Sequence, residues 1–288
     1  VAVYEVGSGS SPVHTINYGD LADGIEGGGS LSNFFPTPIE NVGDVNNDGI
    51  DDLLVGASNS ANEASSAFLY LGGSSLSTQP DETVNLDGLI FPGSSIQRLG
   101  DVNDDGIDDF VVGVGGFGFG SGAYVYYGQD GAPLDFSAPD LTITLNRGSD
   151  ETLQGFPFSV AVGDFNGDGH PDLAGTPFNH LTADGSEGVE AIRIYHGGPN
   201  FDGTPDRKLF IPAPPLGGSG NKYLRSSLGE LQGLSDVTGD GSDDLLVGTA
   251  TGFATNALVY AGNGSEAPEP SIVLRAPDQS RYSGLGPT

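Results

Sequence analysis

Four short segments of the sequence share one spacing of oxygen-bearing side chains that suits a hard metal ion. Each segment reads Asp-x-(Asn or Thr)-x-Asp-Gly-x-x-Asp, and the copies begin at Asp44, Asp101, Asp164 and Asp236. Ca²⁺ takes about six to eight oxygen ligands, and the glycine at position 6 lets the backbone turn sharply around the ion. Because three carboxylates crowded into nine residues would repel one another without a cation, the pattern predicts four Ca²⁺-binding loops.

The predicted ligands are the side chains at positions 1, 3, 5 and 9 of each loop and the backbone carbonyl at position 7. They are Asp44, Asn46, Asp48, Ile50 and Asp52 in the first loop; Asp101, Asn103, Asp105, Ile107 and Asp109 in the second; Asp164, Asn166, Asp168, His170 and Asp172 in the third; and Asp236, Thr238, Asp240, Ser242 and Asp244 in the fourth. A hydroxyl is a poorer oxygen donor than an amide carbonyl, so we expect the loop with Thr238 to bind most weakly.

The residues after each loop predict a β-strand and not the helix of an EF-hand. An EF-hand needs a glutamate at position 12 and a following helix, whereas position 12 here is Val55, Val112, Gly175 or Val247. The segments that follow, LLVG, FVVG, LAG and LLVG, are short, rich in β-forming residues and closed by glycine. Each predicted cation site therefore lies in a β-hairpin.

The loops belong to a longer repeat, since their first ligands are spaced by 57, 63 and 72 residues. An alternating strand that ends in tyrosine follows each loop, and a further copy opens the sequence; these residues are Tyr70, Tyr126, Tyr195, Tyr260 and Tyr4. Another strand follows in every copy, with the sequences HTINY, ETVNL, LTITL, RKLFI and SIVLR. Four short strands per repeat predict an all-β fold built from the blades of a β-propeller.

The repeats resemble the FG-GAP repeats of integrin α-subunit propellers and their bacterial relatives. In that family Phe-Gly precedes a Ca²⁺-binding Asp-x-Asn-x-Asp-Gly-x-x-Asp loop, and Gly-Ala-Pro closes the next strand. Here Phe-Pro replaces Phe-Gly at Phe35, Phe91 and Phe156, the fourth repeat lacks the pair, and GAS, GVG, GTP and GTA stand at the closing position. The resemblance implies one Ca²⁺ between the first and second strands of each blade, and it places partner binding on the opposite face of the propeller.

The repeat phase predicts one propeller domain over residues 1–288. Its approximate repeats are 1–30 (partial), 31–88, 89–150, 151–216, 217–279 and 280–288, the last being a next or closing strand. Because the sequence begins on the third strand of a blade, we favour five blades, with one incomplete blade closed by the two ends of the chain. One alternative is a piece of a seven-bladed propeller. Another is an incomplete blade that a second copy completes.

The composition excludes several classes of protein and favours export. Nine Lys and Arg against 39 Asp and Glu give a formal net charge of −30, and such a surface repels nucleic acid and anionic membranes. No apolar stretch approaches the length of a membrane span. Loops with three carboxylates suit the weak extracellular class of Ca²⁺ sites, which cytosolic Ca²⁺ would leave mostly empty. We therefore expect an extracellular or cell-surface protein.

No set of residues in the sequence predicts an active site. The sequence has no cysteine, no Gly-x-Ser-x-Gly nucleophile motif, and only scattered histidines. The segment GVGGFG from Gly113 matches a dinucleotide motif by letter, but the strand AYVYYG follows it where that motif needs a helix. We therefore expect a protein that is not an enzyme.

Together these observations predict an exported, non-catalytic structural or adhesion module with four Ca²⁺ ions, which presents loops to a protein, a glycan or its own copies. One alternative is a self-assembling subunit of an extracellular filament or sheath, in which copies complete one another's blades. Another is the propeller domain of a polysaccharide-acting enzyme. Such an enzyme should gather titratable groups at the mouth of the central channel.

Overall fold

The structure of the chain is a computed structural model that describes thirteen stretches of the sequence. These are residues 2–3, 14–15, 34–59, 64–73, 76–85, 92–114, 122–131, 133–144, 159–176, 189–211, 227–251, 254–263 and 270–275. Within these ranges all regular secondary structure is β-strand, and the predicted all-β class is confirmed.

Most strands form four antiparallel sheets of four strands each, and every sheet uses its strands in chain order. The first sheet contains β3 (Phe34–Gly43), β4 (Asp52–Asn59), β5 (Ala64–Tyr70) and β6 (Glu82–Asn85). The second contains β7 (Pro92–Gly100), β8 (Asp109–Val114), β9 (Gly122–Tyr126) and β10 (Leu141–Ile143). The third contains β11 (Ser159–Gly163), β12 (Asp172–Thr176), β13 (Val189–Tyr195) and β14 (Arg207–Ile211). The fourth contains β15 (Ser227–Leu234), β16 (Asp244–Thr251), β17 (Ala254–Tyr260) and β18 (Ile272–Arg275).

The second and third strands pair in the same register in all four sheets. The first apolar residue after each predicted metal loop lies opposite the tyrosine that ends the third strand. The pairs are Leu53 with Tyr70, Phe110 with Tyr126, Leu173 with Tyr195, and Leu245 with Tyr260. Because side chains alternate between the two faces of a strand, this shared register gives every sheet the same two faces. The four sheets therefore have the repeated form of propeller blades.

A separate two-stranded sheet precedes the first sheet. Its strands β1 (Ala2–Val3) and β2 (His14–Thr15) pair antiparallel and fall within the predicted third and fourth strands of the partial repeat. Tyr4, Phe91 and the Phe156–Pro157 pair lie outside the described residues, as does the predicted segment 280–288. The single-domain partition and the number of blades stay predictions.

The hydrophobic cores lie between successive sheets. One core joins Val84 and Leu54 of the first sheet to Phe110 and Val112 of the second. Two further cores join the second sheet to the third and the third to the fourth. Tyr126 stacks on Phe110, with ring centroids 5.0 Å apart. Burial of apolar surface against a neighbouring sheet therefore stabilises each blade.

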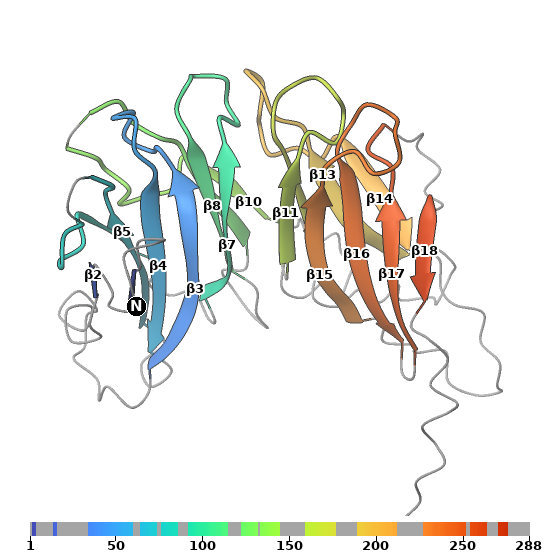
Figure 1. Cartoon of the computed structure of the whole chain (residues 1–288), viewed down its shortest axis with the longest axis horizontal. Helices are drawn as coiled ribbons and strands as arrows, with labels where there is room; N and C mark the ends of the chain where they lie inside the picture. Colours follow the sequence, from blue (N-terminus) through green and yellow to red (C-terminus); the bar gives the residue numbers. More distant parts are fainter. Residues whose placement is uncertain are drawn as a thin grey trace, which may run out of the picture.

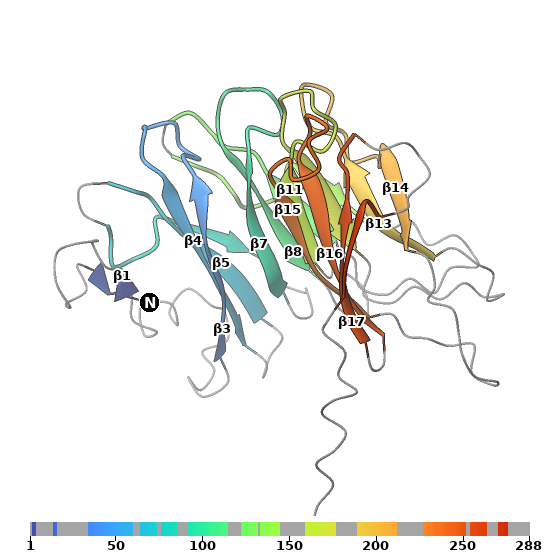
Figure 2. The same ribbon diagram turned by 45° about the vertical axis from the view of Figure 1, so that its right-hand side comes forward.

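The four sheets lie side by side in chain order. The first strand of each sheet contacts the first strand of the next, so β3 lies beside β7, β7 beside β11, and β11 beside β15. Figure 1 shows the first sheet on the left, the fourth on the right and the second between them, and Figure 2 again shows the first sheet on the left. The loops that join the first and second strands of every sheet lie at one common end of the molecule, the upper end in Figure 1.

Candidate metal centre

The four predicted metal loops, residues 44–52, 101–109, 164–172 and 236–244, each connect the first and second strands of one sheet. We refer to them as loops 1 to 4 and count positions from the first aspartate. The connections between third and fourth strands lie at the same end, because antiparallel strands alternate in direction (Figure 1). Backbone groups from these connections can therefore reach the loops.

The aspartate at position 1 fixes the backbone turn of every loop. In loop 1 the two carboxylate oxygens of Asp44 accept hydrogen bonds from the N–H groups of Asp48 and Gly49, at 2.9 and 2.7 Å. Asp101, Asp164 and Asp236 make the same two bonds in the other loops. These bonds gather the backbone around one carboxylate, as a short ligand loop requires.

The glycine at position 6 is needed for its backbone conformation. Its φ is +89° in loop 1, and between +90° and +96° in the other three loops. An added Cβ would meet nothing within 4 Å in any of them, so the constraint is the left-handed φ and not crowding. Position 4 is also left-handed and is Asn47, Asp104, Gly167 or Gly239, the residue types that tolerate this conformation best. The sequence pattern treated position 4 as free, and its choice of residues was a usable signal.

Positions 3 and 5 interact through their side chains in loops 1 to 3. Asn46 accepts a hydrogen bond from the N–H of Asp48 and donates one from Nδ2 to the Asp48 carboxylate. The Asp48 carboxylate in turn accepts the N–H of Ile50 at position 7. In loop 4 the hydroxyl of Thr238 instead donates to Oδ1 of Asp244 at 3.0 Å. Loop 4 therefore differs from the others at the position that the sequence singled out.

Loop 4 brings its three carboxylates closest together. Oxygen atoms of Asp236, Asp240 and Asp244 all lie within 4.8 Å of one another, and among the described residues this is the one such trio of His, Asp and Glu side chains. In the first three loops the predicted ligands also lie on one short turn. Their asparagine amide binds the position 5 carboxylate, as between Asn103 and Asp105 at 2.9 Å.

The aspartate at position 9 is buried and ties the loop to the end of the third strand. In loop 2 the carboxylate of Asp109 accepts the N–H of Val102 at 2.9 Å and the N–H of Gly128 at 2.8 Å. Asp52, Asp172 and Asp244 are equally buried and accept the N–H of Gly72, Gly197 and Gly262. The sequence pattern gave no role to these glycines, although each follows the strand-ending tyrosine by two residues.

Burial makes ionisation of the position 9 carboxyl group costly in loops 1 to 3. It raises the pKa of Asp52 and Asp172 to about 6 and the pKa of Asp109 to about 7, although the backbone N–H donors oppose this shift. The neighbouring aspartates at positions 1 and 5 raise the pKa of Asp109 further. Ionisation of these three carboxyl groups thus lowers stability near neutral pH, and a bound cation would offset that loss.

The residue at position 8 joins neighbouring sheets. In loop 2, Oδ2 of Asp108 accepts the backbone N–H of Asp44 in loop 1 at 2.9 Å and contacts Nη2 of Arg98 at 2.7 Å. In loop 4, Asp243 accepts the N–H of Asp164 in loop 3 at 3.0 Å. The sequence pattern left position 8 free. These contacts could not be found from the sequence, because the partners lie 64 and 79 residues away.

The predicted position 7 residues differ in exposure. Ile50 is exposed, whereas Ser242 is buried and its hydroxyl has no hydrogen-bond partner in the described part of the chain. The His170 ring lies 3.9 Å from the Asp104 carboxylate of the preceding loop.

The GVGGFG segment lies mostly outside the described residues. In the described ranges, no helix is long and apolar enough to cross a membrane.

Comparison with known proteins, like the sheets and loops, indicates a β-propeller built from repeats. The family described as FG-GAP-like repeat matches residues 101–175, and the FG-GAP repeat matches residues 41–70. Integrin alpha-5 of Xenopus laevis is 30% identical over 168 residues, which cover 54% of this chain and 15% of that protein. Integrin alpha-8 of Mus musculus is 34% identical over 46% of this chain and 13% of its own length.

A further relative is the phosphatidylinositol-glycan-specific phospholipase D of Rattus norvegicus, 30% identical over 53% of this chain and 18% of that protein. The matched region thus spans less than a fifth of each of these relatives. Four-stranded sheets joined by repeated acidic loops define a β-propeller protein. Two stretches of the chain match FG-GAP repeat models, and the chain is similar to integrin α-subunits over about half of its length.

Proposed function

We propose that this chain is a Ca²⁺-binding propeller module of an exported protein, and that it is a non-catalytic adhesion module that presents loops to a protein or glycan. The observation that carries the proposal is the repetition of one loop geometry four times at one end of the sheets. The four ions would be held by positions 1, 3, 5, 7 and 9 of each loop. Similarity to integrin α-subunits supports an adhesive role.

The donor set fits Ca²⁺. The predicted ligands are carboxylate, amide, hydroxyl and backbone carbonyl oxygens, which hard cations prefer, and no ligand position carries sulfur. The trio of loop 4 and the buried carboxyl group at position 9 both place negative charge where a cation would stabilise it. Bound Ca²⁺ would supply charge compensation and cross-linking within each hairpin, while the protein's own hydrogen bonds hold the ligands in place.

Titration calorimetry with bound-metal analysis tests the ion assignment. We expect four Ca²⁺ per chain, and the variant Asp105→Ala should bind one fewer. Asp130→Ala is the matched control, because Asp130 is an exposed aspartate at the same end of the second sheet and outside the loops. An unchanged ion count in Asp105→Ala would contradict the assignment of loop 2.

The partner surface would be the end of the sheets opposite the metal loops, as the family resemblance implies. It includes the connections between second and third strands, near residues 58–66, 115–122, 176–188 and 250–256, which are largely outside the described residues. Shortening the connection near 176–188 should abolish binding of Ca²⁺-loaded protein to arrays of matrix proteins and glycans. Binding that survives this change but is lost in Asp105→Ala would place the partner at the metal end instead.

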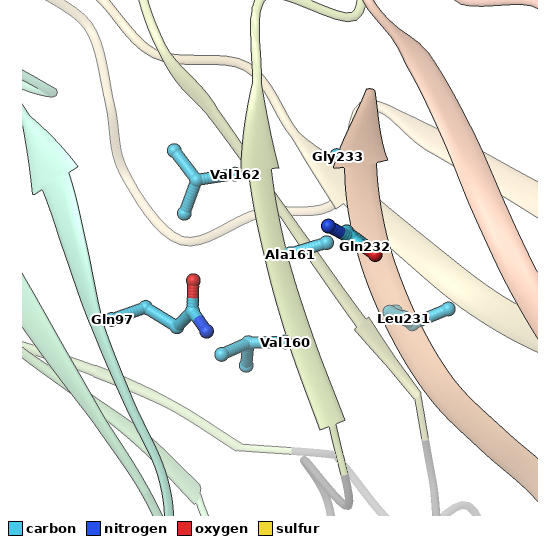
Figure 3. A pocket seen from close by; sticks show the side chains of 7 residues that line it. All are labelled: Gln97, Val160, Ala161, Val162, Leu231, Gln232 and Gly233. Carbon is cyan, nitrogen blue, oxygen red and sulfur yellow. The ribbon is translucent and has the colours of Figure 1, made fainter. Parts of the chain in front are cut away.

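An enzyme domain is the competing function, and the phospholipase D relative is the observation that favours it. A pocket of about 320 Å³ lies among β7, β11 and β15, where an enzyme of this shape would place its catalytic groups. Figure 3 shows its lining, which includes Gln97 and Gln232 beside valine and leucine side chains. None of its lining residues is titratable, so this pocket offers no acid, base or nucleophile. Hydrolysis of phospholipid or polysaccharide substrates by purified protein would overturn the non-catalytic proposal.

A further inference from the structure

One position near the start of the fourth strand carries a different kind of side chain in each sheet. It pairs with the residue just before the strand-ending tyrosine, as Arg207 pairs with Ile194 in the third sheet. Its occupants in the first to fourth sheets are Glu82, Leu141, Arg207 and Ile272. Of these four, only Arg207 is positively charged, in a chain with nine Lys and Arg against 39 Asp and Glu.

This position faces the following sheet. Side chains two residues apart on a strand share a face, and Leu209 lies in the core formed with Leu231 and Leu245 of the fourth sheet. In the same way, Leu141 of the second sheet lies against the third sheet, where an added Cβ at Gly203 would be 3.3 Å from it. Arg207 therefore extends from the third sheet toward the fourth.

The Arg207 side chain reaches the connection that holds the position 9 ligand of loop 4. Its Nη1 donates a hydrogen bond to the backbone carbonyl of Gly262, whose own N–H binds the carboxylate of Asp244 at 3.2 Å. Its Nε is buried and has no hydrogen-bond partner in the described part of the chain. The guanidinium group is thus held beside loop 4 and keeps an unused donor.

The charge of Arg207 also acts on a second predicted ligand of loop 4. Burial lowers the pKa of Arg207, and the carboxylate of Asp240 at position 5 opposes that shift. In loops 1 to 3 an asparagine amide donates to the position 5 carboxylate, whereas Thr238 of loop 4 donates to Asp244 instead. Arg207 therefore supplies positive charge near the position 5 carboxylate that lacks an amide donor from position 3.

We propose that Arg207 is an internal cation that lowers the affinity of loop 4 for Ca²⁺. In the metal-free protein its guanidinium group offsets part of the repulsion among the three carboxylates of loop 4, and it repels a Ca²⁺ ion that they hold. The inference rests on the proposed function, because it concerns the occupancy of one of the four metal loops. Loop 4 would lose Ca²⁺ first as the free concentration falls, for a reason that lies in the third sheet and outside loop 4 itself.

A Ca²⁺ titration followed by NMR tests the inference one loop at a time. The position 6 amides each donate to the first carboxylate of their own loop, so separate resonances report Gly49, Gly106, Gly169 and Gly241. We expect Gly241 to reach its midpoint at the highest Ca²⁺ concentration. Arg207→Gln removes the charge but keeps an N–H donor. It should lower that midpoint about three- to tenfold, the scale of one screened unit charge acting on a divalent ion.

Matched variants separate the charge of Arg207 from its structural role. Lys208→Gln makes the same change in net charge at the next residue of β14, on the other face, and should leave the Gly241 midpoint unchanged. Arg207→Lys keeps the charge and should stay close to the parent protein. Glu82→Arg places a guanidinium group at the equivalent position of the first sheet, facing the second, and should raise the midpoint of Gly106. Melting curves check folding, and Arg207→Met is the second neutral variant.

A double-mutant cycle in a chelator gives a readout that needs no bound ion. If Arg207 offsets the charge of Asp240, Arg207→Gln should cost less in urea denaturation when Asp240→Asn is also present. We expect a coupling of about two- to fivefold in the unfolding equilibrium constant. Equal losses in both backgrounds would contradict the proposal, because an arginine that only binds the Gly262 carbonyl would give that result.

The titration also separates failure of this inference from failure of the proposed function. If Gly241 responds to Ca²⁺ with the same midpoint in Arg207→Gln and in the parent protein, the inference is wrong and the proposed function stands. An unmoved Gly106 midpoint in Glu82→Arg would count against the inference in the same way. If none of the four glycine amides responds to Ca²⁺, the proposed Ca²⁺ binding is wrong, and the inference fails with it.

Discussion

Asp108 of loop 2 accepts a hydrogen bond from the backbone N–H of Asp44 in loop 1, with a nitrogen-to-oxygen distance of 2.9 Å. Asp243 of loop 4 binds Asp164 of loop 3 in the same way, and Gly100 of the second sheet instead lies against Pro171 of loop 3. Position 8 thus forms the seam between neighbouring sheets at the metal end. Each seam residue lies between two predicted ligand positions, so these contacts join neighbouring metal loops directly.

Removing the seam carboxylate should destabilise the protein. Asp108→Ala leaves the N–H of Asp44 and the Arg98 guanidinium without this acceptor, so we expect a loss of about 1–3 kcal/mol in the free energy of unfolding. Urea denaturation in saturating Ca²⁺ measures it. Asp130→Ala, which removes an exposed carboxylate from the same sheet, should cost less than about 0.5 kcal/mol. Equal losses would show that the seam contributes only through net charge.

The buried carboxylate at position 9 should not tolerate an amide. Asp109→Asn replaces one acceptor by a donor, so the N–H of either Val102 or Gly128 loses its partner in a buried site. We expect about 1–3 kcal/mol of destabilisation in urea denaturation with Ca²⁺, and a smaller loss with a chelator, because the amide also removes the cost of the buried charge. Asp101→Asn, at a more exposed ligand position, should show most of its loss only with Ca²⁺. An Asp109→Asn variant as stable as the parent protein in Ca²⁺ would contradict the prediction.

Removal of Ca²⁺ should lower the melting temperature, because only the folded hairpins hold the ligands together. Each site contributes about 2.7 kcal/mol at a free Ca²⁺ concentration one hundred times its Kd. Calorimetric scans with Ca²⁺ and with a chelator measure the difference. An unchanged melting temperature, or no more than one bound ion per chain, would show that the loops are turns without a metal role.

The four loops should differ in their contribution. We expect Asp240→Ala to cost less stability than Asp105→Ala in saturating Ca²⁺, because Thr238 is the poorer donor and its hydroxyl is engaged by Asp244. In a chelator, Asp240→Ala should be neutral or stabilising, since it relieves the repulsion among the three carboxylates of loop 4. Equal losses for both variants in Ca²⁺ would mean that position 3 does not set the affinity.

Gly128 should be sensitive to a single added methyl group. A Cβ there would collide with the backbone oxygen of Asp108 and with Cγ2 of Ile107, so Gly128→Ala should cost about 1–3 kcal/mol. Gly73→Ala is the control from the corresponding connection of the first sheet. It has nothing within 4 Å of an added Cβ, so it should be neutral or slightly stabilising in thermal melts. If Gly73→Ala lost as much stability as Gly128→Ala, the loss would come from the backbone conformation of these connections and not from a collision of the added Cβ.

The sequence by itself determined the parts that depend on neighbouring residues. Asp44, Gly49 and their equivalents follow from the chemistry of a short loop, and the strands ending at Tyr70 or Tyr126 follow from alternation and turn residues. The β-propeller class followed from their repetition, because every copy makes the same local choices. Position 4 of the loops was also readable, since asparagine, aspartate and glycine share one backbone preference.

Only the tertiary structure decided the contacts between sheets. The role of Asp108 depends on Asp44 of another repeat, and the role of Gly128 depends on how closely it approaches loop 2. Val237 and Val45 stand at the same position of the same motif, yet one is exposed and the other buried. The repeat pattern is identical in both cases. Burial is fixed by whether a following sheet packs on that face, and local sequence carries no record of that packing.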